Sequence, residues 1–97
     1  MKASVSPEAE RELIDGAQFY AREANSQLGL ALILEFERAL DILRAYPRLG
    51  PVWRGPTRRF PLRRFPYSIV YQVAPEGIRV IALAHHRRRP GYWHGRT

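Results

Sequence analysis

The sequence predicts a single α+β domain over residues 1–97, in which a hairpin of two helices packs on one face of a small, mainly antiparallel β-sheet. Three observations support this fold class. Apolar residues recur at helical spacing over residues 7–46, and they follow strand spacing over residues 58–84. A loop rich in proline and glycine separates the two regions. The predicted order of elements is β-α-α-β-β-β.

The first half of the chain contains a short predicted strand at residues 2–6 and then two helices. Ser6 and Pro7 mark a helix start, because serine is a favoured N-cap and proline is favoured at the first helical position. An apolar stripe predicts that this helix runs from residue 7 or 8 to about 24. Asn25 then caps a second helix, and so short a link implies an antiparallel hairpin. Neither stripe carries a cofactor-binding pattern, so both are interpreted as core.

A loop and an edge strand are predicted next. The loop covers residues 47–57, and its Trp53 is expected to plug one end of the core. Residues 58–64 are predicted to be extended, with Arg59 and Arg63 on the face away from the core. A proline inside this run predicts that the strand lies at a sheet edge or is bulged, because proline cannot donate a ladder hydrogen bond.

The last two predicted strands form a hairpin. They cover residues 67–73 and 78–84, and a turn at residues 74–77 joins them. In the first strand one face carries Tyr67, Ile69, Tyr71 and Val73. The second strand is apolar on both faces, which indicates a central position in the sheet.

Charge is distributed very unevenly along the chain. Residues 1–47 carry five basic and eight acidic groups, a net charge of −3. Residues 48–97 carry eleven arginines and one acid, Glu76, a net charge of +10. A unit this cationic favours a nucleic acid or an acidic protein segment as partner, since arginine recognises phosphate or carboxylate through two parallel hydrogen bonds. The alternative is that the charge serves solubility alone.

Several functional classes are excluded or disfavoured. The chain has no cysteine, which excludes disulfides, thiolate metal sites and a cysteine nucleophile, and fits a cytoplasmic location. The opening MKASVSPEAER has no apolar stretch, so we expect no signal peptide. The longest uncharged apolar run, Leu28–Leu34, is far shorter than the ~20 residues that a membrane span needs. Motifs for phosphate loops, zinc proteases and serine hydrolases are missing, and we expect no cofactor.

Metal binding by histidine is not expected either. His85 and His86 are adjacent at a strand end, so their side chains point to opposite faces. No acid lies nearby in sequence to complete a site with His94. The roles of these three histidines stay undetermined at the level of sequence.

An arginine-rich surface with interleaved aromatic residues carries the candidate chemistry. The candidate residues for binding a target or partner are Arg59, Arg63, Arg87, Arg88, Arg89, Tyr92 and Trp93. Arginines can hold phosphates, bases can stack on Tyr92 or Trp93, and metal-free cleavage of a phosphodiester is feasible with a histidine or tyrosine moving protons. Two structural alternatives stay open. Arg87–Arg89 can be a solvated tail, and Trp93 can turn back to cover the sheet.

Four segments together resemble the RelE/ParE superfamily of toxins from bacterial type II toxin–antitoxin (plasmid stabilisation) systems. They are SPEAEREL at the first helix, YPRLG after the second helix, LRRFPYSIVYQV, and HHRRRPGYW. The resemblance covers nearly the whole chain and keeps the order of elements. It implies a toxin neutralised by a cognate antitoxin, within a homodimer or a toxin–antitoxin hetero-oligomer. ParE-like members poison DNA gyrase, whereas RelE-like members cut mRNA in the ribosomal A site.

The resemblance also implies roles for individual residues. Arg63 stands at the place of a phosphate-contacting arginine of RelE-type toxins, and Arg88, or its neighbour Arg87, stands at the place of the second. Tyr92 lies near the place of the C-terminal tyrosine. For a nuclease the catalytic set is therefore Arg63, Arg88, His85 and Tyr92.

Two departures favour the ParE-like branch. No carboxylate lies between Asp41 and Glu76, so the general-base glutamate of some family nucleases has no counterpart. The lysines that RelE carries before Arg63 are missing, and the H-x-R-R ending is closer to ParE-type members. We therefore predict a toxin that binds and inhibits its target, DNA gyrase. The alternatives are a RelE-like, metal-independent mRNA endoribonuclease that depends on the ribosome, and a degenerate member that only binds antitoxin or DNA.

Overall fold

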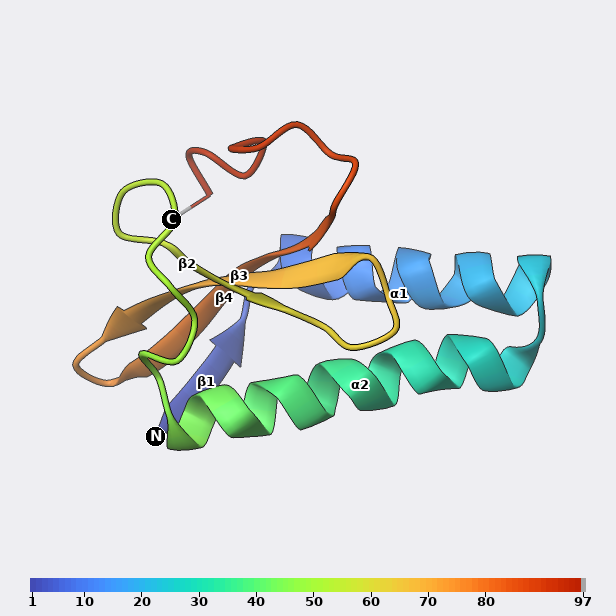
Figure 1. The fold of residues 1–97 in the computed structure, drawn as a ribbon, viewed down its shortest axis with the longest axis horizontal. Coiled ribbons are helices and arrows are strands. Elements are labelled where there is room, and N and C mark those ends of the chain that lie inside the picture. The colour runs from blue at the N-terminus through green and yellow to red at the C-terminus, as the bar shows by residue number, and fades with distance from the viewer. Residues whose placement is uncertain (97) are drawn as a thin grey trace.

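The chain folds into two helices against a four-stranded sheet (Figure 1). A computed structural model describes residues 1–96. The elements are β1 (Lys2–Val5), α1 (Pro7–Glu23), α2 (Ser26–Ala45), β2 (Arg58–Pro61), β3 (Tyr67–Ala74) and β4 (Gly77–His85). The sheet order is β1-β4-β3-β2, with β1 parallel to β4 and the other neighbours antiparallel. The predicted fold class, element order and central position of the last strand are confirmed.

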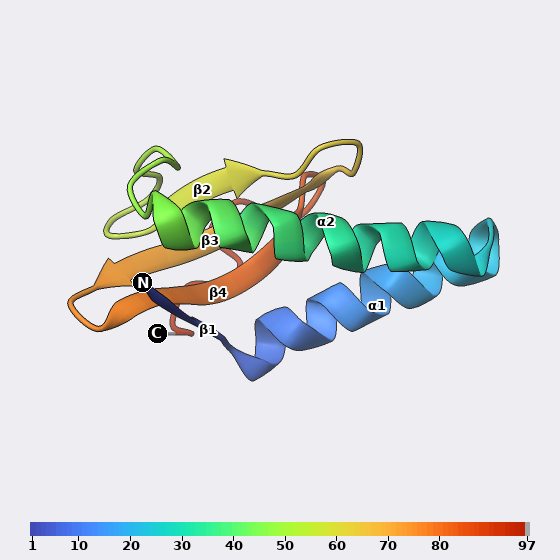
Figure 2. The same cartoon turned by 90° about the horizontal axis from the view of Figure 1, so that it is seen from below.

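The helix hairpin covers one face of the sheet, as Figure 2 shows. The predicted caps are confirmed: the Ser6 side chain accepts from the Ala9 N–H at 3.1 Å, and Asn25 accepts from Leu28 N–H at 2.8 Å. Near the link the two helices approach backbone to backbone. A Cβ at Gly29 would lie 2.5 Å from the Ala17 carbonyl oxygen, so only glycine fits there.

The main core lies between the helices and the sheet. Its fully or almost fully buried members are Ala9, Leu32, Phe36, Ala39, Leu43, Leu62, Phe65, Ile69, Tyr71, Ile78, Val80 and Leu83. The predicted face of β3 is confirmed, since Ile69 and Tyr71 are fully buried there and Tyr67 and Val73 pack against the same cluster.

A second, smaller cluster lies on the sheet face opposite the helices, called the outer face below. Its buried members are Val70, Ile81, Ala82, Ala84 and Trp93. A bulge in β4 contributes to it: Tyr71 pairs with Val80 and Val70 pairs with Ala82, so Ile81 is an extra residue. This places two consecutive residues of β4 in the outer cluster and leaves the strand apolar on both faces.

Two expectations for the region before β3 were wrong. The edge strand ends at Pro61 instead of continuing to residue 64, so Arg63 lies in the turn between β2 and β3. The turn forms because Glu35 of α2 accepts the Arg63 N–H. Trp53 does not plug an end of the main core. It packs on the outer face against Trp93, with 4.9 Å between ring centroids.

Candidate functional site

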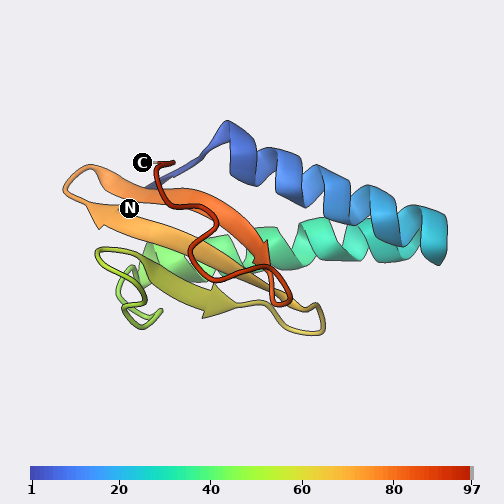
Figure 3. The ribbon, with the colours of Figure 1, turned by 90° about the horizontal axis from the view of Figure 1, so that it is seen from above.

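The candidate site is the outer face, which is covered by residues 86–96, called the C-terminal segment below. Figure 3 shows this red segment crossing the sheet on the side away from the helices. Trp93 is only 4% exposed and anchors it. The interpretation that the end of the chain turns back to cover the sheet is confirmed. Two parts that are distant in sequence, loop 47–57 and the C-terminal segment, therefore meet through their tryptophans.

Two arginines on this face lie flat on aromatic rings. The Arg59 guanidinium is 4.2 Å from the ring centroid of Trp53, and that of Arg88 is 3.9 Å from the centroid of Tyr92. Such cation–π contacts orient a guanidinium while its N–H edge stays available for an anionic group. The segment thus holds Arg88 in a defined position, although its side chain is exposed.

A cavity of about 80 Å³ lies between these two arginines. Ser68 and His86 also line it, and the Ser68 hydroxyl is 2.9 Å from Nε2 of His86. Ser68 is only 2% exposed, whereas His86 is exposed. The cavity therefore combines two cations with a hydroxyl–imidazole pair, which suits a small anionic group.

His85 lies at the end of β4 and also lines this cavity. Its ring packs edge-on against Tyr67, with centroids 5.0 Å apart, and its Nδ1 accepts the Arg87 N–H at 3.1 Å. Burial, and then the positive charges of Arg87 and His86, lower the pKa of His85 below its ordinary value. The imidazole is therefore neutral at pH 7 and acts as a hydrogen-bond acceptor.

The hydroxyl of Tyr92 already has a hydrogen-bond partner within the protein. It donates to Oε2 of Glu12 at 2.6 Å, and burial together with this carboxylate raises the Tyr92 pKa well above its ordinary value. The phenol is thus protonated at neutral pH and already has an acceptor. Sequence reasoning found no carboxylate near this chemistry, but α1 brings one to it.

Glu12 is the residue that sequence reasoning missed. A signal was nevertheless present, since Glu12 lies three residues after Ala9 and four residues before Gly16, both of which are buried. That spacing places it on the buried side of the helix, where a carboxylate needs partners.

Arg63 lies apart from the small cavity. Its backbone N–H donates to Oε2 of Glu35 at 2.7 Å, and Arg38 clamps the same carboxylate through two hydrogen bonds of 2.7 Å. This contact fixes the β2–β3 turn on α2, and it lowers the Glu35 pKa, with the Arg38 hydrogen bond as the largest cause. The structure therefore groups Arg88, His85 and Tyr92 around one cavity, and Arg63 is not among the residues that line it. Arg87 and Arg89 are exposed on the C-terminal segment.

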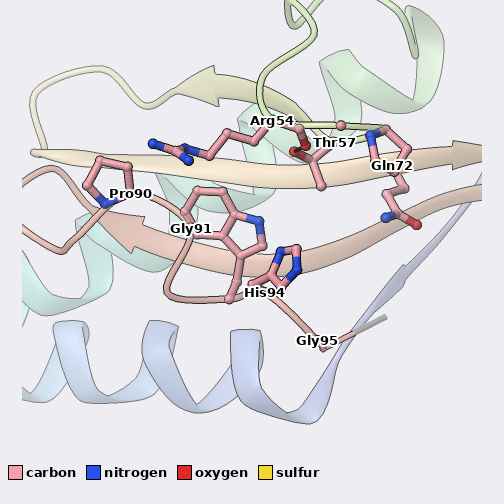
Figure 4. A pocket seen from close by; sticks show the side chains of 10 residues that line it. Arg54, Thr57, Gln72, Pro90, Gly91, His94 and Gly95 are labelled. Carbon is pink, nitrogen blue, oxygen red and sulfur yellow. Dashed lines mark hydrogen bonds between the residues drawn. The ribbon is translucent and has the colours of Figure 1, made fainter.

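A larger, open pocket of about 630 Å³ lies between loop 47–57 and the C-terminal segment (Figure 4). Figure 4 shows Arg54 on one wall and His94 on the other, with Gln72 of β3 to one side of both. Thr57 donates to the carbonyls of Trp53 and Arg54, which closes the loop into a tight turn. Among residues 1–96 no carboxylate lines this pocket, so this part of its lining suits an anionic group.

Two further findings concern metals and membranes. Within residues 1–96, no three His, Cys, Asp or Glu side chains gather as metal ligands would. None of the helices in that range is long and apolar enough to cross a membrane.

The fold and this surface define a small basic α+β protein whose outer face carries arginines beside aromatic rings. Residues 3–90 match the sequence model of the family described as "ParE toxin of type II toxin-antitoxin system, parDE". The chain belongs to this family. The resemblance to the RelE/ParE superfamily, and to its ParE-like branch, is thereby confirmed, and membership implies a cognate antitoxin as partner.

The same fold occurs among solved structures. A chain of the "Chromosomal ParDE TA system from P. aeruginosa" superposes with a TM-score of 0.78 at 18% sequence identity. The match covers 88% of this chain and 95% of that chain. At this identity the likeness shows the common fold. No curated protein sequence matches the chain.

Proposed function

We propose that this toxin acts in the cytoplasm by binding and inhibiting DNA gyrase, and that its cognate antitoxin neutralises it. The observation that carries this proposal is the pairing of Tyr92 with Glu12. In a nuclease the tyrosine and a carboxylate would be expected to face the substrate. Here they bind each other and fix the C-terminal segment, which supports a binding surface more than a proton-transfer site.

The chemistry of this surface suits an acidic partner. Residues 48–97 carry a net charge of +10, and the residues proposed to contact gyrase or antitoxin are Arg59, Arg63, Arg87, Arg88, Arg89 and Tyr92, with Trp93 supporting them from below. Complementary charge accelerates association and selects the partner, and aromatic rings beside arginines are frequent hot spots of interfaces. Trp93 acts through its packing, because its ring is buried.

A supercoiling assay with purified gyrase tests the proposal. The wild-type toxin should inhibit supercoiling, and Arg88→Ala should weaken this inhibition while the fold is retained, because surface substitutions rarely cost much stability. Arg11→Ala is the matched control: this arginine is exposed on α1, on the helix side of the molecule. Unchanged supercoiling at a large excess of wild-type toxin would overturn the proposal.

A second candidate function is the RelE-like, metal-independent cleavage of mRNA on the ribosome. The small cavity favours it, because Arg59, Arg88 and His86 meet there and can hold a phosphate. Primer extension on cellular mRNA during expression should then show cuts in the A site, and Arg63→Ala should abolish them. Intact messages would exclude this function. Normal growth on induction without antitoxin would instead indicate a degenerate member that only binds antitoxin or DNA.

A further inference from the structure

The edge of β4 is completed by a side chain. β1 pairs with β4 only as far as Val80, so the next backbone groups of β4 need other partners. The start of α1 supplies them. Ser6 donates its N–H to the Val80 carbonyl at 2.9 Å and its hydroxyl to the Ile81 carbonyl at 3.1 Å. The Leu83 N–H then donates to Oε1 of Glu12 at 3.1 Å.

The same carboxylate binds the C-terminal segment at two points. Tyr92 donates to Oε2 at 2.6 Å, and the Arg96 guanidinium donates to Oε1 at 3.0 Å and to Oε2 at 3.4 Å. The side chains of Glu12 and Arg96 are only 17% and 20% exposed. Charge-assisted hydrogen bonds with so little exposure are stronger than surface ion pairs, because solvent screens them less.

Besides Glu12, the segment is bound at its start, where the His86 N–H donates to the Pro66 carbonyl at 2.8 Å and the His86 ring lies 2.9 Å from the Ser68 hydroxyl, and near its end, where Arg96 donates to the Ile81 carbonyl at 3.4 Å. The segment contains no helix or strand, and residues 86–90 and 94–95 are exposed. Trp93 is its buried anchor, and the two contacts with Glu12 flank that anchor in sequence. The Arg88 guanidinium lies on the ring of Tyr92, so the position of Tyr92 sets the position of Arg88.

We propose that Glu12 is the positioning residue of the C-terminal segment. Its carboxylate holds Tyr92 and Arg96 on the outer face and so presents Arg87–Arg89 to the partner as an ordered surface rather than a mobile tail. The second half of this statement, that the ordered surface contacts the target, rests on the proposed function. The first half stands on the geometry of the segment alone.

A carboxylate is required at this position because its neighbours are all donors. The Leu83 N–H, the Tyr92 hydroxyl and the Arg96 guanidinium converge on it, and an ionised carboxyl group is acceptor-only with two oxygens. A glutamine offers one oxygen and one NH₂ group. With its oxygen at the place of Oε1, Glu12→Gln keeps the bonds from the Leu83 N–H and from Arg96 to that atom but loses the negative charge and the acceptor Oε2, to which Tyr92 donates, whereas Glu12→Ala loses all of these bonds.

Hydrogen exchange of the full chain tests the positioning. The reporters are the turn amides of Tyr92, His94 and Arg96, which donate to carbonyls inside the segment. In Glu12→Ala their exchange should accelerate at least about tenfold, the factor expected when charged hydrogen bonds are lost, while the amides of β3 stay protected. Glu12→Gln, which retains the β4 contact, should show a smaller acceleration and keeps the test valid if the alanine variant fails to fold.

Two comparisons separate positioning from a general loss of stability. Glu10→Gln removes the same charge from an exposed position two residues away and should leave the exchange of the segment unchanged. Arg96→Met removes the ion pair but keeps the bond from Tyr92, so it should accelerate exchange less than Glu12→Ala does. The double variant of Glu12→Ala and Arg96→Met should be no faster than Glu12→Ala alone, because the alanine already removes that ion pair. Wild-type exchange rates in both Glu12 variants, or additive effects in the double variant, would overturn the positioning role.

The supercoiling assay then tests the presentation of the surface. Glu12→Gln should inhibit gyrase less strongly than wild type, although no arginine of the C-terminal segment has been changed. Full inhibition by a variant with a released segment would overturn the claim that order in the segment matters for the target. Failure of the wild-type toxin to inhibit gyrase would instead refute the proposed function, and the exchange experiment would still decide the role of Glu12.

Discussion

The hydroxyl of Tyr71 offers a sharp test of how loop 47–57 is held in place. Tyr71 is fully buried in β3; its hydroxyl donates to the Pro47 carbonyl at 2.7 Å and accepts from the Gly50 N–H at 3.0 Å. Burial raises the Tyr71 pKa, so the group is protonated at every ordinary pH. Tyr71→Phe removes only an oxygen but leaves two backbone groups without this partner. A buried group without a partner costs about 1–3 kcal/mol, so we expect the free energy of unfolding to fall by about 2–4 kcal/mol.

Urea and thermal unfolding followed by circular dichroism measure this loss. For a chain of this length each kcal/mol lowers the midpoint temperature by about 4–8 °C, so the melting point should fall by about 10–25 °C. Tyr46→Phe is the matched control, because the same atom is removed from a side chain that is 67% exposed and should change stability by less than about 0.5 kcal/mol. If the two variants lose equally little stability, the hydroxyl does not hold the loop and this reasoning is wrong.

Three further predictions concern the helices and two titrating groups. Gly29→Ala should destabilise the protein by about 1–3 kcal/mol in urea unfolding, despite the better helix propensity of alanine, because the new Cβ would lie 2.5 Å from the Ala17 carbonyl oxygen; a gain in stability would show that the helices can move apart. The lowered pKa of His85 means that the unfolded chain takes up this proton more readily, so stability should fall as the pH drops from 7 through 6.5 to the folded pKa. His85→Gln should flatten this slope, and an unchanged slope would contradict the assignment. The pKa of Glu35 is lowered mainly by the Arg38 hydrogen bond. The stability that ionised Glu35 contributes is therefore present above the unfolded pKa of 4.5 and is lost as the pH falls through the folded pKa. Acid unfolding of Glu35→Gln, compared with wild type, should lack this pH-dependent loss.

Much of the fold could be predicted because it depends on residue patterns that are short in sequence. The caps at Ser6 and Asn25 bind amides only three residues further along the chain, and the apolar stripes depend on the repeat of a helix or strand. The split in charge and the return of Trp93 to the sheet were also readable from the chain. These features need no knowledge of which distant residues meet.

The features that were predicted wrongly or missed all involve contacts between residues that are distant in sequence. The turn that contains Arg63 ends β2 early because Glu35, 28 residues away, accepts its N–H. Trp53 has its partner in the C-terminal segment, and the extra residue Ile81 in β4 changes which side chains face outward. The periodicity of the sequence does not predict such pairings, because each depends on how separate elements pack in three dimensions.

The sequence divides into a half with net negative charge and a half with strong positive charge, and Glu12 connects the two. This acid belongs to the acidic half in sequence, yet its bonds join β4 to Tyr92 and Arg96, which lie 80 and 84 residues further along the chain. A cluster of arginines repels itself, and an ordered cationic surface therefore needs an acid placed behind it. One carboxylate both completes the sheet edge and supplies that charge. Experiments that substitute only the arginines would attribute the function to the arginines alone. Their arrangement, however, depends on a glutamate near the other end of the chain.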